Sequence, residues 1–331
     1  MPSPQQGTDA LITAVCEAIE TQRYEVVFSS DDEGVVALSA NRELLPAIVP
    51  YGSHDTVLRA FDKLELTRAA EAEGIAVPRT IEPTSSALSS WQGPVVVKPA
   101  LTFAAGSDRR LNTVVLDDPG EAHERVEEIL RAGVRAMLQE VIHGDLCAVS
   151  VLSDRESQVV ALCQQRAELT WPPQAGVSAR AITVPCDDDL CAQVTGLIKR
   201  LGWFGLAQLQ FLADADGSFK LLDFNGRFYG SLALAISAGM DFPAMWARLA
   251  TDRPLPTIPT PAAGRRYQWF SRDLRASLAE SDINPWRSMI DTVLTSFGST
   301  HSVWRTSDPW PAIHHYGGGL LQEGLGRIFG R

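Results

Sequence analysis

A stretch near residue 225 places three chemically useful side chains at alternate positions of a predicted strand. Leu222 and Phe224 alternate with Asp223 and Asn225, and residues two apart in a strand share one face. Arg227 lies on the same face if the chain stays extended. Carboxylate and amide oxygens suit Mg²⁺, which proteins usually hold with few side chains together with phosphate oxygens. A neighbouring guanidinium can bind a phosphoryl group during its transfer. The alternative is a solvated strand face whose polar side chains have no such role.

A hairpin must position these residues. We expect it to span residues 206–224, with a turn of four residues, 214–217, at its tip. If those four are unpaired, Gln208 faces Asp223 across the hairpin. Gln210 then lies on the same side of the sheet, so both amides add oxygen atoms to one surface.

A lysine at the end of another predicted strand is a candidate for phosphate binding. Lys98 follows the β-branched run 95–97 and precedes Pro99 and a stretch of small residues, 100–107. Small residues let backbone N–H groups approach an anion closely. Many strands end in lysine, so this position alone is a weak indication. The expected strand 136–142 is followed closely by a glycine, which leaves further backbone groups exposed.

Alternation of helical and extended patterns predicts the α/β class. Residues 1–90 are interpreted as a short lobe and linker that begin on a helix rather than a strand, so the lobe is abridged. Its expected elements are a helix over 11–19, extended runs at 24–28 and 47–49, and a helix over 55–73. The acidic run 29–33 is interpreted as an exposed turn.

Residues 91–253 form the predicted body. Its expected elements are strands over 95–98, 113–116, 136–142, 147–152 and 158–165, helices from 118 and over 187–201, and the hairpin. The segment 167–177 contains Trp171-Pro172-Pro173 and is predicted to be a loop, because proline cannot donate to a central ladder. A Pro-rich linker opens the C-terminal extension, residues 254–331, which is expected to end in a short amphipathic packing helix.

Composition excludes several classes of function. The chain has 331 residues and a formal net charge of -11, which repels nucleic-acid phosphates. Five cysteines without paired spacings do not predict a disulfide framework, and the first residues lack the pattern of a signal peptide. No apolar run reaches the roughly 18 residues that a membrane-spanning helix needs. These features predict a cytoplasmic protein that binds neither nucleic acid nor membrane.

Five short motifs occur in a fixed order along the chain. They are Asp62-Lys63-Leu64; Gly74-Ile75-Ala76-Val77-Pro78; Val95-Val96-Val97-Lys98-Pro99; Gln139-Glu140-Val141-Ile142-His143-Gly144-Asp145; and Leu222-Asp223-Phe224-Asn225-Gly226-Arg227-Phe228-Tyr229-Gly230-Ser231. In this order they resemble the ATP-grasp superfamily, and within it the carbamoyl-phosphate-synthetase-like branch with its carboxylate–amine ligases. The resemblance implies an ATP-grasp fold, in which two α+β lobes sandwich ATP, between a short pre-grasp lobe and a C-terminal extension.

The resemblance also implies roles for individual residues. Lys63 and Lys98 would contact the ATP phosphates, and Arg227 would contact the γ-phosphate or the acyl phosphate, so Lys98 and Arg227 are the catalytic candidates. The other ATP-binding candidates are Gln139, Glu140, Val141, Ile142 and Asp145. Magnesium, with Mn²⁺ as an alternative, would be held by three side chains: Gln210, Asp223 and Asn225.

Two departures from the family pattern bear on these roles. Leu146 stands where the family commonly has an acid for the ribose hydroxyls, so Asp145 substitutes for it or the contact is absent. The usual Glu-Ile-Asn-Pro-Arg reads Asp-Phe-Asn-Gly-Arg at residues 223–227. The shorter Asp223 keeps the charge but shifts the metal, and Gly226 is expected to loosen the turn.

The implied reaction joins a carboxylic acid to an amine, such as an amino acid, with ATP converted to ADP and phosphate through an acyl phosphate. Arg166, Trp171 and Arg180, in and around the predicted loop, are candidates for binding the substrate. Bicarbonate or carbamoyl-phosphate chemistry is an alternative, and so is a nucleotide-binding partner subunit without catalysis. A homo-oligomer and a partner protein that completes the short lobe both stay open.

Overall fold

The computed structural model describes residues 7–101, 111–173, 176–214, 217–279, 285–305 and 307–315. The chain forms two compact units. Unit 1 comprises Met1–Gln165, Pro185–Tyr229 and Met240–Pro261, and unit 2 comprises Arg166–Val184, Gly230–Gly239 and Ala262–Arg331. The predicted boundaries at residues 90 and 253 do not coincide with this division and stay predictions. In the described part of the chain, no helix has the length and apolarity needed to cross a membrane.

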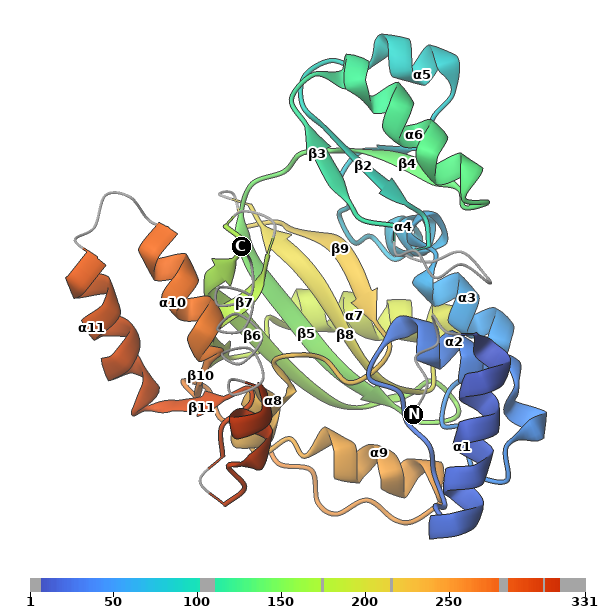
Figure 1. Ribbon diagram of the computed structural model, residues 1–331, viewed down its shortest axis with the longest axis vertical. Coiled ribbons are helices and arrows are strands. Elements are labelled where there is room, and N and C mark those ends of the chain that lie inside the picture. The colour runs from blue at the N-terminus through green and yellow to red at the C-terminus, as the bar shows by residue number, and fades with distance from the viewer. Residues whose placement is uncertain are drawn as a thin grey trace, which may run out of the picture. The chain divides into compact units, whose positions relative to one another are not determined.

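The first part of unit 1 is largely helical (Figure 1). Its elements are α1 (Thr8–Gln22), α2 (Asp32–Ala40), η2 (Arg42–Leu44), α3 (His54–Phe61) and α4 (Lys63–Ala72). The two expected strands are reduced to one parallel bridge between Val26 and Ile48. The expected helix 55–73 is two helices, because Asp62 leaves helical geometry between them. Its carboxylate instead caps α4, accepting the backbone N–H of Leu64 at 3.0 Å and that of Glu65 at 3.1 Å.

A four-stranded antiparallel sheet follows, in the order β1-β4-β2-β3. Its strands are β1 (Thr80–Ile81), β2 (Val95–Pro99), β3 (Val114–Leu116) and β4 (Ala136–Glu140). Its helices are α5 (Ser85–Ser90), η3 (Pro119–Glu121) and α6 (Ala122–Arg131). Val126 and Ile129 of α6 pack against Val95, Val97 and Leu138 of the sheet, which anchors the strand that carries Lys98.

A second sheet of unit 1 has the order β6-β5-β8-β9 and carries the hairpin (Figure 1). Its strands are β5 (Asp145–Ser153), β6 (Val159–Trp171, of which the residues from 166 belong to unit 2), β8 (Gly205–Ala213) and β9 (Phe219–Asn225). Strand β5 pairs antiparallel with β8, and β8 pairs antiparallel with β9. Two helices belong to this part of the unit, α7 (Asp188–Leu201) and α9 (Phe242–Ala250). Trp246 of α9 is completely buried.

The pairing of β8 with β9 differs by two residues from the expected register. Gln210 lies opposite Asp223 and Gln208 lies opposite Asn225. One residue of the difference lies in the turn, which is longer than expected, and the other is a β-bulge that inserts Leu222. Because the shift is an even number, the amides and the site residues still share one face of the sheet.

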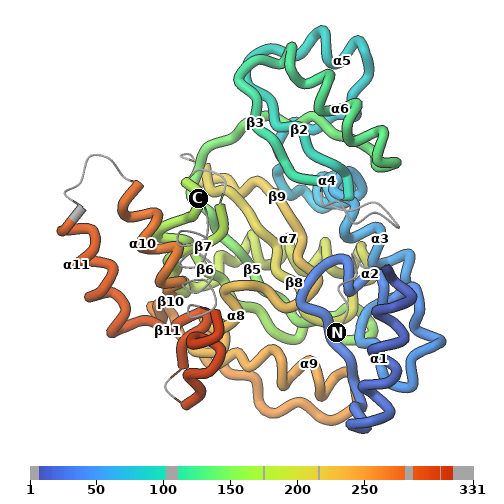
Figure 2. Tube along the Cα trace, viewed as in Figure 1, coloured from blue at the N-terminus to red at the C-terminus, as the bar shows by residue number. Residues whose placement is uncertain are grey.

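Unit 2 contains the end of β6 and three more strands or strand segments, in the order β11-β10-β7-β6. Its other elements, whose trace Figure 2 shows, are β7 (Val177–Val184), α8 (Leu232–Ser237), β10 (Arg266–Gln268), α10 (Phe270–Ala279), α11 (Pro285–Ser296) and β11 (Ser299–His301). The loop predicted over 167–177 is wrong, because β6 continues to Trp171 and β7 begins at Val177. Pro172 and Pro173 follow the last strand residue, so they remove no ladder hydrogen bond. The helix expected near residue 325 lies outside the described residues.

Candidate functional site

Two lysines and one aspartate from distant parts of unit 1 lie together. Lys63 is the first residue of α4, Lys98 lies near the end of β2, and Asp223 lies near the end of β9. The Nζ atom of Lys63 is 3.1 Å from Oδ1 of Asp223. The backbone N–H of Lys63 donates to the carbonyl oxygen of Ala100 at 2.9 Å, which ties the start of α4 to the chain directly after β2.

The ammonium group of Lys98 is buried, with only 6% of the residue exposed. Burial, together with the positive charge of Lys63, lowers the pKa of Lys98 to about 8, although Asp223 opposes the shift. Burial alone would raise the pKa of Asp223, but Lys63 and Lys98 hold this pKa below its usual value. Two cations therefore share one carboxylate, and an incoming anion such as a phosphate would stabilise the charged form of Lys98.

Arg227 is held by acceptors on three residues. Its Nε donates to Oδ1 of Asp32 at 2.6 Å, and its Nη2 lies 3.4 Å from Oδ2 of Asp32. Nη2 also donates to Oδ1 of Asn225 at 2.9 Å, and Nη1 donates to the carbonyl oxygen of Phe228 at 3.2 Å. A guanidinium has five N–H groups, so these contacts with described residues leave one N–H of Nη1 available. Asp32 also balances the charge of Arg227, since both side chains are mostly buried.

Asp32 is a site residue that the sequence reasoning missed. It is the first residue of α2, next to Asp31, whose carboxylate caps the helix by accepting the N–H of Gly34 at 2.7 Å. The acidic run 29–33 was expected to be an exposed turn, but Asp32 reaches Arg227 across 195 positions of sequence. Acidic residues are common in the first turn of helices, so the local pattern contains no signal for this contact.

The oxygen ligands predicted for a metal ion lie on adjacent strands. Gln210 is opposite Asp223, and the buried Asn225 follows on the same strand. In the described ranges, no group of three His, Cys, Asp or Glu side chains could hold a metal ion by itself. One carboxylate with amide oxygens fits Mg²⁺ when phosphate oxygens complete the coordination shell. Metal binding by these three residues stays a prediction.

Close packing explains why a glycine separates Asn225 from Arg227. A Cβ atom at Gly226 would lie 2.4 Å from two ring carbons of Trp203 and 2.9 Å from the ring of Phe61. Trp203 is fully buried and meets the ring of Phe224 edge-on, with 4.9 Å between the centroids. Gly226 therefore lets an aromatic cluster hold the end of β9 firmly, whereas the sequence suggested a loosened turn.

Comparisons with known proteins bear on the fold that carries these residues. Residues 134–272 match a family described as "ATP-grasp in the biosynthetic pathway with Ter operon". Among solved structures, pyruvate carboxylase from Rhizobium etli has a TM-score of 0.62 and 15% identity, over 77% of this chain and 23% of that one. Biotin carboxylase from Campylobacter jejuni gives 0.61 and 14%, over 77% and 60% of the two chains. L-amino acid ligase from Bacillus licheniformis gives 0.60 and 18%, over 80% and 66%. The chain has the ATP-grasp fold.

The family match includes the strands β8 and β9 and with them the segment from Asp223 to Arg227. The chain spans less than two thirds of the length of each of the three solved proteins, and at such low identities the structural similarity shows a shared fold alone. No curated protein matches the sequence.

The segment expected to bind adenine connects β4 to β5. The Nε2 atom of Gln139 donates to the hydroxyl of Thr80 at 2.8 Å, so this amide is used within the small sheet. The carboxylate of Glu140 lies 3.7 Å from Nζ of Lys220, which links the start of the segment to β9. The other candidates are at least partly exposed: Val141, Ile142 and Asp145. Nucleotide binding by this segment stays a prediction.

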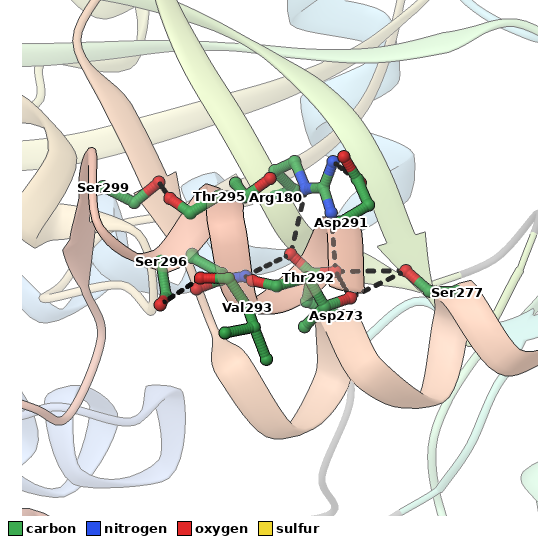
Figure 3. A network of polar contacts seen from close by, with 10 residues as sticks. Arg180, Asp273, Ser277, Asp291, Thr292, Val293, Thr295, Ser296 and Ser299 are labelled. Atoms are coloured by element: carbon green, nitrogen blue, oxygen red, sulfur yellow. Dashed lines mark hydrogen bonds and ion pairs between the residues drawn. The ribbon is translucent and has the colours of Figure 1, made fainter. Parts of the chain in front are cut away.

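The three substrate candidates belong to unit 2. Nε and Nη2 of Arg180 donate to the two carboxylate oxygens of Asp273, both at 2.9 Å, and Nη1 donates to Asp291 at 2.9 Å (Figure 3). The guanidinium that was expected to bind a substrate carboxylate thus binds two carboxylates of the protein itself. Arg166 is exposed and Trp171 is half-buried at the end of β6. Their role in substrate binding stays a prediction.

Proposed function

We propose that this ATP-grasp protein joins a carboxylic acid to an amine, using ATP to form an acyl phosphate and releasing ADP and phosphate. The observation that carries the proposal is the convergence of Lys63, Lys98 and Asp223. Asn225 ends the strand of Asp223, and Arg227 follows two residues beyond it. Phosphoryl transfer depends on positioning and on charges arranged in advance, and this convergence supplies both.

ATP binding in this proposal begins with the two lysines. Lys98 is buried, and its lowered pKa indicates that its charged form is destabilised when no phosphate is bound. A phosphate in contact with Lys63 and Lys98 compensates both ammonium groups. Asp223, Asn225 and Gln210 are the residues that would hold Mg²⁺, which when bound neutralises charge on the phosphate oxygens.

Two bond exchanges complete the reaction. A carboxylate oxygen of the acid attacks the γ-phosphorus, and the bond from this phosphorus to the β–γ bridging oxygen breaks, which gives an acyl phosphate and ADP. The amine nitrogen then attacks the carbonyl carbon, the phosphate leaves, and the nitrogen loses a proton to give the amide. Arg227 can donate one remaining N–H to an anionic oxygen. Because Asp32 balances its charge, we assign Arg227 a role in orientation more than in charge neutralisation.

Bicarbonate chemistry is the second candidate, because pyruvate carboxylase and biotin carboxylase are among the similar solved structures. In that case bicarbonate would take the place of the carboxylic acid, and attack on the γ-phosphorus would give carboxyphosphate. The same lysines, oxygen ligands and Arg227 would serve both reactions. The two functions therefore differ in the molecule that accepts the γ-phosphoryl group, a carboxylic acid or bicarbonate.

Measuring ADP release separates these functions. The protein is supplied with Mg-ATP and a panel of amino acids and other carboxylic acids, each with and without an amine, and separately with bicarbonate. ADP release that needs an acid and an amine, with a product mass equal to their sum minus water, supports the ligase. Release that needs bicarbonate alone supports the second candidate, and nucleotide binding without turnover contradicts both. Lys98→Ala should raise the ATP dissociation constant about tenfold or more, whereas Lys199→Ala, at an exposed lysine of α7, should not.

A further inference from the structure

Helix α11 in unit 2 buries polar side chains and exposes apolar ones. Its residues that are buried against the unit are hydroxyl residues, Ser288 at 6% exposure and Thr292 at 0%. The hydroxyl of Thr292 donates to Oδ1 of Asp273 at 3.0 Å, and Arg180 binds Asp291 on the same helix (Figure 3). Polar contacts therefore attach α11 to its own unit.

The opposite face of α11 is apolar and exposed. Trp286, Ile290 and Leu294 lie four positions apart, which places them on one side of the helix. Phe297 follows directly after the last helical residue, Ser296. The exposed fractions of these four apolar residues, in chain order, are 72%, 59%, 64% and 84%. Met289 and Val293 lie between them and are 38% and 45% exposed. We call these six residues the α11 stripe.

The α11 stripe is large enough to form most of one side of a protein–protein interface. A buried aromatic side chain covers 150–250 Å², so Trp286 and Phe297 together expose on the order of 300 Å². With the four aliphatic residues the stripe reaches roughly 600 Å², the upper end of the largest apolar patch on a typical monomer. A standard interface covers about 800 Å² on each partner, including a polar rim, so the stripe supplies most of one side.

The charges on α11 favour a second copy of the chain as the partner. The helix carries one arginine, Arg287, and one aspartate, Asp291, so it has no net charge to select a strongly acidic or basic partner. It also lacks the basic face of a helix that lies on a membrane. A neutral, straight apolar stripe is complementary to an antiparallel copy of itself, because a two-fold axis brings the same patch from both chains together.

We propose that two copies of this protein pair through their α11 stripes, with residues 290–294 of each copy at the two-fold axis. The polar network around Asp273 holds α11 to its unit from behind, so the apolar face is presented on a fixed support. The proposal concerns assembly and does not depend on the ligase function.

Sedimentation velocity on the full chain tests the proposal. At about 20 µM protein, where a dissociation constant of ~1 µM leaves most chains paired, we expect a dimer of the 36.0 kDa chain. Ile290→Glu and Leu294→Glu should each raise the dimer dissociation constant by about thirtyfold or more, the effect of removing an interface hot spot. Leu130→Glu is the matched control, because Leu130 is a helical leucine with 52% exposure on α6, and it should leave the dimer intact.

The substitution Leu294→Ala shortens the side chain without adding a charge, so it tests the same contact if a glutamate variant fails to fold. Circular dichroism checks the folding of every variant. Leu294→Ala should weaken the dimer in the same direction. A monomeric wild-type protein overturns the proposal, and so does a dimer that survives all three stripe substitutions. If the wild type is monomeric and deletion of residues 316–331 increases the binding of an apolar dye, the occupant is that segment. If the monomer instead sediments with phosphatidylcholine vesicles, the occupant is a membrane.

Discussion

Replacing Asp32 with asparagine separates the positioning of Arg227 from the binding of ATP. The carboxylate of Asp32, the first residue of α2, makes two contacts with Arg227, at 2.6 Å and 3.4 Å. If Arg227 orients an oxygen of the reacting groups, its geometry depends on Asp32. The substitution keeps the size of the side chain and removes only its charge and one acceptor.

The expected magnitude follows from the burial of the pair. Exposures of 17% for Arg227 and 20% for Asp32 leave little solvent screening, so losing a charge-assisted hydrogen bond here costs about 1.5–3 kcal/mol of unfolding free energy. Asn225 and Phe228 still accept from Arg227, so the guanidinium stays near its place but gains freedom. A misplacement of about 1 Å can lower a rate by up to 100-fold, and we therefore expect kcat to fall by about 10- to 100-fold.

Steady-state kinetics and ATP binding measured on the same variants form the assay. Asp32→Asn should lower kcat while the ATP dissociation constant changes by less than about threefold, which is the pattern for a lost interaction outside ground-state binding. Asp31→Asn is the control, because Asp31 caps α2 and asparagine caps a helix equally well. Unchanged turnover in a folded Asp32→Asn protein would refute the positioning role. Faster turnover would show that Asp32 competes with the substrate for Arg227.

Three further outcomes are expected at the site. ATP binding should take up a proton near pH 8, because free Lys98 has a pKa of about 8 and a phosphate favours its charged form. ATP affinity is then constant below about pH 7 and falls as the pH rises through 8, by up to tenfold per pH unit. Calorimetry in buffers of different ionisation enthalpy measures the proton uptake, and it should detect none for Lys98→Met. Asp223→Asn should fold but lose turnover, with partial recovery in Mn²⁺, and normal turnover in Mg²⁺ would move the metal site elsewhere. Gly226→Ala should cost about 1–3 kcal/mol in denaturant unfolding, because the added methyl group overlaps Trp203, and an unchanged midpoint would contradict that packing.

Local patterns predicted much of the fold correctly, because the physics behind them is local. The helices α1 and α7 each depend on apolar spacings between neighbours a few positions apart. The ordered motifs predicted the ATP-grasp fold, which the comparisons support. The break between α3 and α4 was missed, since it depends on whether Asp62 caps a helix or continues one.

Long-range contacts and irregular backbone were beyond the reach of these patterns. The β-bulge at Leu222 has no strong local signature, and together with the longer turn it made the predicted register wrong by two residues, although the shared face was right. The bond from Asp32 to Arg227 joins segments 195 positions apart, and only tertiary structure brings them together. The same applies to the convergence of Lys63 with Asp223, which the resemblance implied and local periodicity could not.

Arg180 illustrates how a residue type can suggest the wrong kind of partner. Its two-pronged geometry suits any carboxylate, and here Asp273, which has no exposed surface, takes both prongs. Breaking such a buried pair leaves a carboxylate uncompensated, which typically costs 3–5 kcal/mol. Arg180→Ala should therefore speed hydrogen exchange in α10 and α11 and leave the ATP KM unchanged. A higher KM for the acid or amine with unaltered exchange would instead return Arg180 to the substrate site. If both change together, the kinetic effect cannot be assigned to substrate contact, and Arg166→Ala, at an exposed arginine, becomes the sharper probe of substrate binding.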